Sequence, residues 1–457
     1  MRYIFIFILF SVVSFAQKKS NLSQEVWVDS VYNQLSFEER VGQLFMVAAY
    51  SNKDEAHNKS IDKLVEENKI GGLIFFQGGP VRQAKLTNRY QAKSKVPMFI
   101  GIDAEWGLSM RLDSTYRYPW NMTLGAVQDM KLIEKAGNQM AKQSKRMGIH
   151  FNFAPVVDIN TNPKNPIIGN RSFGETKENV TLRALALMKG LQDEGVFATA
   201  KHFPGHGDTS TDSHHTLPVV KFDKNRLDDV ELYPYKELIK NGLTSVMVAH
   251  LNVPSIEPRE NYPTSISYNV VTNILKNELQ FEGLIFTDAL NMKGASNFKK
   301  PGDIDLEAFL AGNDVLLFAE NVPVAIKKFN EAKKDGRLTE ERLAYSVKKI
   351  LAYKYKANLH NYQPIALENL YNDLNAVEFE ALNYQLYENA VTVIKNDTKS
   401  IPVAQLDKEK IAYVKLGNDS SDVFLTQLKN YANVTEITSK NLDSVLVELQ
   451  DYTKVII

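Results

Sequence analysis

The chain has 457 residues, with 54 basic and 54 acidic side chains and no cysteine. This length suffices for a barrel-sized domain and part of a second one, and the zero net charge creates no overall field that favours nucleic acid or an anionic membrane surface. The lack of cysteine excludes disulfides, thiolate metal sites and cysteine nucleophiles.

Residues 1–16, MRYIFIFILFSVVSFA, have the pattern of a secretory signal peptide. Arg2 supplies a positive start, residues 3–13 form an apolar run, and Ser14, Phe15 and Ala16 provide a small-x-small cleavage site. No later run of about 18 apolar residues follows, so no membrane span is expected in the mature protein. The sequence therefore predicts an exported protein, either periplasmic or secreted.

Residues 17–355 are predicted to form a (β/α)₈ TIM barrel. Ser36 and Glu39 make a capping box that starts a helix, and short apolar runs then alternate with amphipathic segments, as in βα units. The eight candidate strands are residues 44–49, 72–76, 98–102, 151–157, 197–200, 244–249, 283–286 and 314–318. An open doubly wound sheet is the alternative, because a count of strands does not show closure.

Residues 356–390 are predicted to be a linker followed by a helix, and residues 391–457 the start of a C-terminal α/β domain. Apolar runs at 391–397, 410–416 and 454–457 are candidate strands, and 423–431 is a candidate helix. The last run has no covering element after it, so we expect the sequence to be a truncated form of a longer protein.

Ionisable residues follow five of the candidate barrel strands: Asp103, Asp158, the pair Lys201 and His202, His250, and Asp288. All strands of a barrel point the same way, so these side chains are expected to converge on the C-terminal rim, where barrel enzymes keep their active sites. For His250 we favour a hydrogen-bonded histidine of the barrel mouth. Asp288 suits a nucleophile that attacks a sugar carbon, but capping of the next helix is an equally good interpretation.

A loop rich in glycine and proline, residues 201–218, holds four of the eight histidines. Asp212 and His214 have i, i+2 spacing, so in an extended loop they lie on one side and the carboxylate can orient the imidazole for general acid/base work. A surface pair that only orders the loop is the simpler alternative. A metal site made of His202, His206 and Asp208 is disfavoured, because that spacing matches no helix-borne ligand pair.

Two further segments carry candidate binding residues. Asp103, with Glu105 and Arg111 nearby, could bind vicinal hydroxyls. Arg171 could grip a carboxylate or a ring hydroxyl, or it could tie its own loop to Glu175.

The composite motif KHFPGHG, followed after four residues by Asp212, Ser213 and His214, resembles the signature of the β-N-acetylglucosaminidase branch of family 3 glycoside hydrolases. That branch acts on peptidoglycan-derived muropeptides. The resemblance covers residue 36 to about residue 350, and it implies a (β/α)₈ barrel, often followed by an α/β sandwich domain, and a retaining double displacement without cofactor or metal.

Residue by residue, the resemblance implies that Asp288 is the nucleophile and His214 the general acid/base, with Asp212 orienting the imidazole. The positions that match the family's sugar-binding residues are Asp103, Arg111, Arg171, Lys201 and His202. The sequence departs from the family pattern at Trp106 and Leu108, where a glycine and an arginine are usual.

The expected function is an exported exo-β-N-acetylglucosaminidase whose partner is a carbohydrate substrate. A β-glycoside phosphorylase is one alternative, since a histidine acid/base does not repel phosphate as a carboxylate does. A barrel that binds peptidoglycan without catalysis is another. The complete set of candidate catalytic residues argues against this last possibility.

Overall fold

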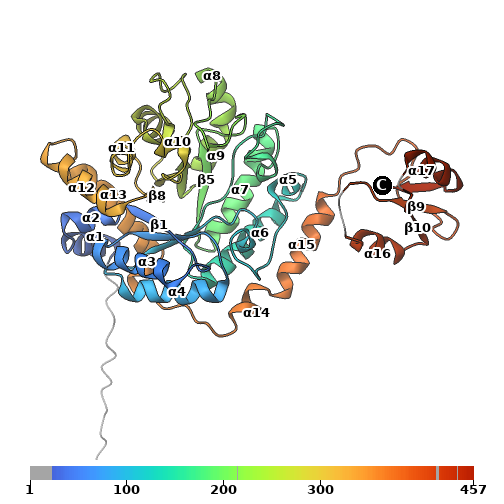
Figure 1. Ribbon diagram of the computed structural model, residues 1–457, viewed down its shortest axis with the longest axis horizontal. Helices are drawn as coiled ribbons and strands as arrows, with labels where there is room; N and C mark the ends of the chain where they lie inside the picture. The colour runs from blue at the N-terminus through green and yellow to red at the C-terminus, as the bar shows by residue number, and fades with distance from the viewer. Residues whose placement is uncertain (1–22, 214, 418–420, 440) are drawn as a thin grey trace, which may run out of the picture. The chain divides into compact units, whose positions relative to one another are not determined.

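The computed structural model describes residues 23–213, 215–417, 421–439 and 441–457, and the predicted signal peptide lies outside these residues. The chain divides into two compact units, one that ends at Val391 and one from Thr392 to Ile457 (Figure 1). No helix within the described part of the chain is long and apolar enough to cross a membrane.

The first unit is built on an eight-stranded parallel sheet in the order β7-β6-β5-β4-β3-β2-β1-β8. Its strands are β1 Phe45–Ala49, β2 Gly72–Phe75, β3 Phe99–Ile102, β4 Phe151–Asn152, β5 Phe197–Phe203, β6 Ser245–Val248, β7 Leu284–Thr287 and β8 Leu316–Leu317. A bridge between Phe286 and Val315 joins the two ends of the sheet. The sheet is therefore closed, which confirms the barrel and excludes the open doubly wound sheet.

Helices surround this barrel (Figure 1). They are α1 Gln24–Asn33, α2 Phe37–Gly42, α3 Glu55–Asn68, α4 Pro80–Lys93, α5 Asn121–Leu124, α6 Met130–Arg146, α7 Lys177–Asp193, α8 Lys224–Arg226, α9 Tyr233–Lys240, α10 Lys293–Ser296, α11 Asp303–Ala311, α12 Val322–Lys334 and α13 Glu340–Lys356, with π-helical turns at Leu227–Glu231 and Asn269–Glu278. The capping box predicted at Ser36 and Glu39 opens α2, with both reciprocal hydrogen bonds present.

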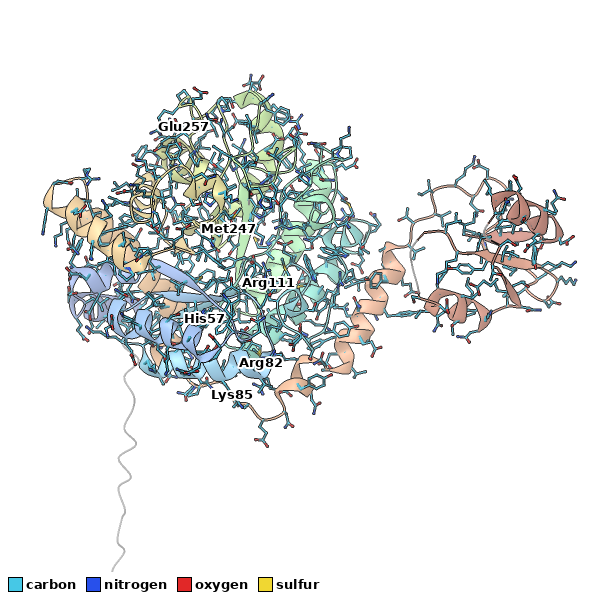
Figure 2. All side chains as sticks on the ribbon, in the orientation of Figure 1. His57, Arg82, Lys85, Arg111, Met247 and Glu257 are labelled. Atoms are coloured by element: carbon cyan, nitrogen blue, oxygen red, sulfur yellow. The ribbon has the colours of Figure 1, made fainter. Side chains whose placement is uncertain are left out.

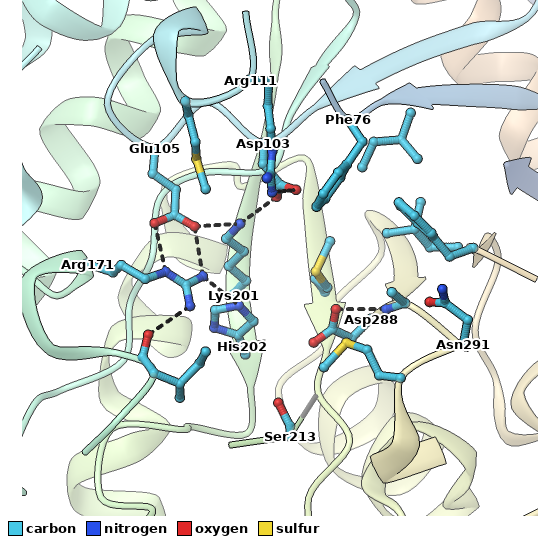
Figure 3. Close-up of a pocket in the computed structure, with 18 of the residues that line it drawn as sticks. Phe76, Asp103, Glu105, Arg111, Arg171, Lys201, His202, Ser213, Asp288 and Asn291 are labelled. Atoms are coloured by element: carbon cyan, nitrogen blue, oxygen red, sulfur yellow. Dashed lines mark hydrogen bonds and ion pairs between the residues drawn. The ribbon is translucent and has the colours of Figure 1, made fainter. Parts of the chain in front are cut away.

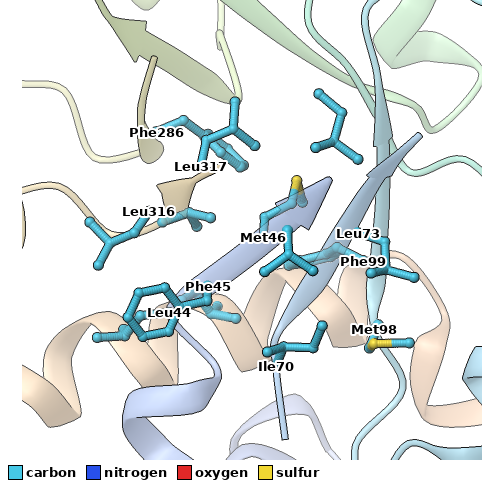
Figure 4. Packing of buried hydrophobic residues seen from close by; sticks show 14 of the residues in the cluster. Leu44, Phe45, Met46, Ile70, Leu73, Met98, Phe99, Phe286, Leu316 and Leu317 are labelled. Carbon is cyan, nitrogen blue, oxygen red and sulfur yellow. The ribbon is translucent and has the colours of Figure 1, made fainter. Parts of the chain in front are cut away.

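Aromatic side chains fill the interior of the barrel. The ring of Phe286 lies 5.0 Å from that of Phe151 and 5.3 Å from that of Phe153, centroid to centroid. A Cβ atom at Gly101 would lie 2.8 Å from the Phe153 ring, so only glycine leaves room for it. Figure 4 shows Phe286 beside Leu317, with Met46 on β1 and Phe99 on β3. This packed layer fills the interior of the barrel, so a cavity inside the barrel can lie only above it, at the strand ends.

Strand β4 is shorter than the predicted run 151–157. It ends at Asn152, because the amide of Ala154 donates to the carbonyl of Asn152 over 2.8 Å and not to a neighbouring strand, and Pro155 has no amide hydrogen. The residues after β4 still contact β5, since the amide of Val157 donates to the carbonyl of Lys201 over 2.8 Å.

Two helices, α14 Leu370–Leu374 and α15 Val377–Ala390, follow an irregular segment and pack on the first unit. The amide of Gln143 on α6 donates to the carbonyl of Leu374 over 2.8 Å, and Arg146 pairs with Asp373 over 2.7 Å. Residues 356–391 are thus joined to the barrel by polar contacts as well as by apolar packing.

The second unit is a three-stranded parallel sheet in the order β10-β9-β11 with two helices. Its elements are β9 Ile411–Val414, α16 Val423–Lys429, β10 Val434–Ile437, α17 Leu442–Glu448 and β11 Lys454–Ile456. The strand predicted at 391–397 is wrong: these residues form no strand, and Ile394 is 95% exposed. An apolar run becomes a strand only where a neighbouring strand pairs with it.

Candidate active site

A cavity of about 540 Å³ lies at the C-terminal end of the barrel. It is lined by residues that follow β2, β3, β5, β7 and β8, together with side chains from the loops between them. Arg111 and Met247, which both line it, lie near the middle of the barrel unit in Figure 2. Side chains from the ends of several strands therefore line one cavity, as the sequence predicted.

The ammonium group of Lys201 joins two carboxylates at one wall of this cavity. Its Nζ lies 2.8 Å from Oδ1 of Asp103 and 2.9 Å from Oε1 of Glu105, and the side chain is only 2% exposed. The other oxygen of Asp103 accepts from Nη2 of Arg111 over 2.6 Å. Burial alone would raise the pKa of Asp103, but the charges of Lys201 and Arg111 hold it well below its usual range. Asp103 is therefore ionised at neutral pH.

Arg171 reaches the same wall from the short 3₁₀ turn Gly169–Arg171. Its Nε and Nη2 atoms donate to the two oxygens of Glu105 over 3.0 and 2.8 Å, a two-pronged ion pair (Figure 3). The partner that ties this loop is thus Glu105 and not Glu175. Burial would raise the pKa of Glu105, but Arg171 and Lys201 lower it to about 2.

The imidazole of His202 lies between the guanidinium of Arg171 and the carboxylate of Asp158. Its Nε2 lies 3.2 Å from Nη2 of Arg171, and its Nδ1 lies 2.6 Å from Oδ2 of the buried Asp158. A guanidinium only donates hydrogen bonds, so Nε2 of His202 is the acceptor. The proton of the ring is therefore on Nδ1, which donates a hydrogen bond to the carboxylate of Asp158. The β5–β6 pairing shifts register between Ala200 and Phe203, and both Lys201 and His202 line the cavity.

Asp288 lies across the cavity from this charged wall. Figure 3 shows Glu105 and Arg171 along one side and Asp288 and Asn291 along the other. One carboxylate oxygen of Asp288 accepts from the amide of Ala289 over 2.8 Å. Burial would raise its pKa, but nearby His250, His202 and Lys201 and the Ala289 amide together lower it. Asp288 is therefore an ionised carboxylate facing the cavity.

Asp288 does not cap a helix. The next helix, α10, begins only at Lys293, and Met292 stands at its N-cap without a side-chain hydrogen bond. The capping interpretation of Asp288 is therefore wrong, and its carboxylate lines the cavity instead. His250 behaves as expected for a histidine of the barrel mouth: it is buried, with Nδ1 2.7 Å from the Ser265 hydroxyl and Nε2 3.0 Å from the Ala289 carbonyl.

The loop 201–218 lines the cavity with His206 and Ser213 as well as with Lys201 and His202. His206 lines the cavity, and its Nδ1 and Nε2 contact the hydroxyls of Thr209 over 2.6 Å and Ser213 over 3.1 Å. Asp212 lies next to Ser213, which also lines the cavity, whereas His214 lies outside the described residues. Asp208 accepts from Thr161 over 3.0 Å, and within the described part of the chain no group of His, Asp or Glu side chains is arranged to hold a metal ion.

Sequence reasoning named three further residues near the site but did not identify their contacts. Glu105 bridges Lys201 and Arg171, Asp158 holds His202, and His206 faces the cavity. A signal existed for Glu105, because it follows Asp103 by two residues at a strand end, where alternate side chains share a face. The pairing of Asp158 with His202 depends on contacts between separate strands, which no local spacing reveals.

The charged side chains of the cavity balance. Asp103, Glu105 and Asp288 are acidic, and they are matched by Arg111, Arg171 and Lys201. Such a cavity offers many hydrogen-bond donors and acceptors without a strong net field. This arrangement suits an uncharged ligand rich in hydroxyl groups, with one carboxylate, Asp288, on the opposite side.

Residues 36–353 match the family described as Glycosyl hydrolase family 3 N terminal domain. Over 373 residues the chain is 33% identical to Beta-hexosaminidase A of Pseudoalteromonas piscicida, an alignment that covers 74% of this chain and 61% of that protein. The chain thus spans less than two thirds of the length of this relative.

The solved structures that are similar to this one include a glycosidase and a phosphorylase. A glycoside hydrolase family 3 beta-N-acetylglucosaminidase from Paenibacillus sp. str. FPU-7 is 31% identical, with a TM-score of 0.75, over 92% of this chain and 84% of that chain. Beta-glucoside phosphorylase BglX has a TM-score of 0.81 over 95% of this chain and 81% of its own, but at 24% identity it shows a likeness of fold alone.

Proposed function

Because the chain belongs to glycosyl hydrolase family 3, we propose that it is a retaining exo-β-N-acetylglucosaminidase that removes terminal β-linked N-acetylglucosamine from peptidoglycan-derived or related glycans. The observation that carries this proposal is the position of Asp288, an ionised carboxylate across a charge-balanced cavity from Asp103 and Lys201. The names of the relatives support the choice of an N-acetylated sugar.

In the first step of the proposed reaction, a carboxylate oxygen of Asp288 bonds to the anomeric carbon while the bond from that carbon to the leaving oxygen breaks. The leaving oxygen takes a proton from His214, which Asp212 orients. In the second step, His214 takes a proton from water, the water oxygen attacks the anomeric carbon, and the carboxylate of Asp288 is released. Two displacements at one carbon retain the β configuration.

The charged wall is proposed to bind the hydroxyl groups of the terminal sugar. The carboxylate of Asp103 is held rigidly by Lys201 and Arg111, so it accepts hydrogen bonds without loss of side-chain freedom on binding. Arg171 and His202 complete the sugar-binding set, with Glu105 and Asp158 holding them in place. The same network keeps the cavity rigid before the sugar arrives.

The nucleophile is tested by substitution and by trapping. Asp288→Ala should lower kcat by at least about 1,000-fold, because the covalent intermediate cannot form. Asp208→Asn, an acid of the loop outside the cavity, serves as the matched control and should retain activity. A 2-fluoro sugar with a good leaving group should label Asp288 of the wild-type chain, as read by mass spectrometry of its peptides. Labelling of another residue would overturn the assignment.

Product analysis separates hydrolysis from the alternatives. Free N-acetylglucosamine released at a rate independent of added phosphate supports the proposal, whereas a sugar 1-phosphate would identify a phosphorylase. Binding of glycan without any release would identify a non-catalytic barrel. The leader-like residues 1–16 further support the proposal of export, which N-terminal sequencing of the mature protein tests.

A further inference from the structure

A second cavity, of about 590 Å³, adjoins the first and has no role in the reaction described above. The two cavities share three lining residues, Tyr50, Asn291 and Phe318. The second cavity extends from this shared wall between α3 and residues 318–323, the segment that joins β8 to α12. A ligand seated against Asp288 can therefore continue into it.

The shared wall is aromatic. The ring of Phe318 meets that of Phe76 edge to face, with centroids 5.7 Å apart, and the ring of Tyr50 lies 5.8 Å from Phe76. The guanidinium of Arg111 lies 3.8 Å above the Phe76 ring and links this wall to Asp103. All three rings are half-buried, so each keeps a surface that a ligand can cover. Figure 3 shows Phe76 on the side of the cavity that also carries Asp288 and Asn291.

The backbone of Phe318 is held in an unfavourable conformation. Its φ angle is +54°, in the left-handed region that bulky side chains rarely adopt. Its amide nonetheless donates to the carbonyl of Met46 over 3.0 Å, which continues the pairing of β8 with β1. A turn alone would be easier with glycine or asparagine, so the ring of Phe318 must contribute something other than the turn. Strained residues of this kind gather at functional sites.

The second cavity has little net charge. Its charged lining residues, Lys63 and Glu320, have opposite signs, and the remaining polar members are neutral, such as Ser60, Asn68 and Asn291. Neutral hydrogen-bonding groups beside an aromatic ring match a sugar ring, whose apolar face packs on the aromatic surface while its hydroxyls reach the amides. The lining residues of the second cavity carry no excess charge that could balance a multiply charged ligand.

We propose that this second cavity binds the leaving group, and that it takes an uncharged pyranose packed against Phe318. The inference rests on the proposed function, because the terminal sugar must occupy the first cavity. Tyr50, Asn291 and Phe318 then flank the bond that breaks. Substrates with a second sugar ring are favoured over those with a small leaving group, and Phe318 is a specificity-determining residue.

The test compares two donors on one set of variants. One donor is a β-linked N-acetylglucosamine disaccharide, and the other is the β-glycosyl fluoride, which has no ring in its leaving group. Phe318→Gly suits the left-handed backbone and removes the ring. It should lower kcat/KM at least about tenfold for the disaccharide, the loss expected for one aromatic contact, and less than about threefold for the fluoride.

Phe318→Tyr keeps the ring and should restore kcat/KM for the disaccharide. Asn358→Gly is a matched control, because Asn358 also has a positive φ of 59° but lies in neither cavity. It should change neither donor's kcat/KM. An equal loss on both donors, or no loss on the disaccharide, would overturn the inference.

Binding provides a readout that does not depend on turnover. In the Asp288→Asn background, calorimetry should show weaker disaccharide binding after Phe318→Gly, with unchanged binding of N-acetylglucosamine. If the wild-type chain releases sugar from neither donor while this difference in binding persists, the proposed function fails and the second binding site stands. If turnover is present and the difference in binding is absent, the site fails and the proposed function stands.

Discussion

The hydroxyl of Ser213 lies 3.1 Å from Nε2 of His206, so the loop that carries Asp212 is attached to the wall of the cavity. Burial lowers the pKa of His206 to about 4, which keeps its ring neutral and able to donate at one nitrogen and accept at the other. On its other side the loop meets α10, where the amide of Gly294 donates to the Ser213 carbonyl over 3.3 Å. The position of the loop therefore depends on two separate elements.

Gly294→Ala should displace this loop. A Cβ atom at Gly294 would lie 3.0 Å from the carbonyl oxygens of Ser213 and Thr216, closer than most real contacts. Because these two residues stand on either side of position 214, we expect kcat/KM to fall about tenfold for substrates with poor leaving groups. Ser296→Ala in the same helix is the control. Unchanged kinetics of the Gly294 variant would show that the loop does not need this contact.

His214→Ala should affect substrates according to their leaving groups. Only a poor leaving group needs a proton, so kcat/KM should fall on the order of 100-fold or more for a disaccharide and little for an activated aryl glycoside. Asp212→Asn should show the same selectivity in a milder form. Steady-state kinetics on both substrates would measure it, and equal losses on both would remove His214 from the role of acid.

Glu105→Gln should lower stability in a manner that depends on pH. The folded-state pKa of Glu105 is about 2, below its ordinary value, so the ionised form stabilises the fold above pH 4.5. This contribution declines as the pH falls below that value and is lost as the pH passes through about 2. We expect a loss on the order of 3 kcal/mol near neutral pH.

Urea unfolding from pH 7 down to pH 3 would measure the effect of Glu105→Gln. The difference from wild type should shrink on acidification, whereas the exposed Glu368→Gln should match wild type throughout. A difference that stays constant with pH would mean that the cost arises from packing and not from the charge of Glu105.

Phe286→Ala should destabilise the barrel unit by about 3 to 5 kcal/mol, because it leaves a void between Phe151 and Phe153. Phe286→Leu fills most of that volume and should cost less. Equilibrium unfolding followed by circular dichroism would compare them. A loss below about 1 kcal/mol for the alanine variant would show that the interior layer collapses around the gap.

Much of the barrel could be read from local patterns. The runs ending at Asp103, Lys201 and Asp288 were recognisable because a strand buried on both faces is continuously apolar and ends at a polar residue. The same patterns misled at residues 391–397, where an apolar run has no strand to pair with. Strand formation depends on a partner, and periodicity along one segment carries no information about it.

The sequence predicted which residues belong to the candidate site better than it predicted which of them contact one another. Asp103, Arg111, Lys201, His202 and Asp288 do line one cavity. Their partners were not foreseeable, since hydrogen-bond pairing within a cavity depends on side-chain distances between separate strands. Arg171 illustrates this: from the sequence its nearest acid is Glu175, but the fold gives it Glu105.

By itself, the sequence determined the kind and order of the barrel strands, the capping of α2 and the family, because these follow from propensity, periodicity and a local motif. Only the tertiary structure decided that the sheet closes between Phe286 and Val315 and that Asp288 faces Asp103 and Lys201 across one cavity. Closure and charge pairing join residues far apart in the chain. They are settled by the packing of the whole barrel, which brings the carboxyl ends of its strands together.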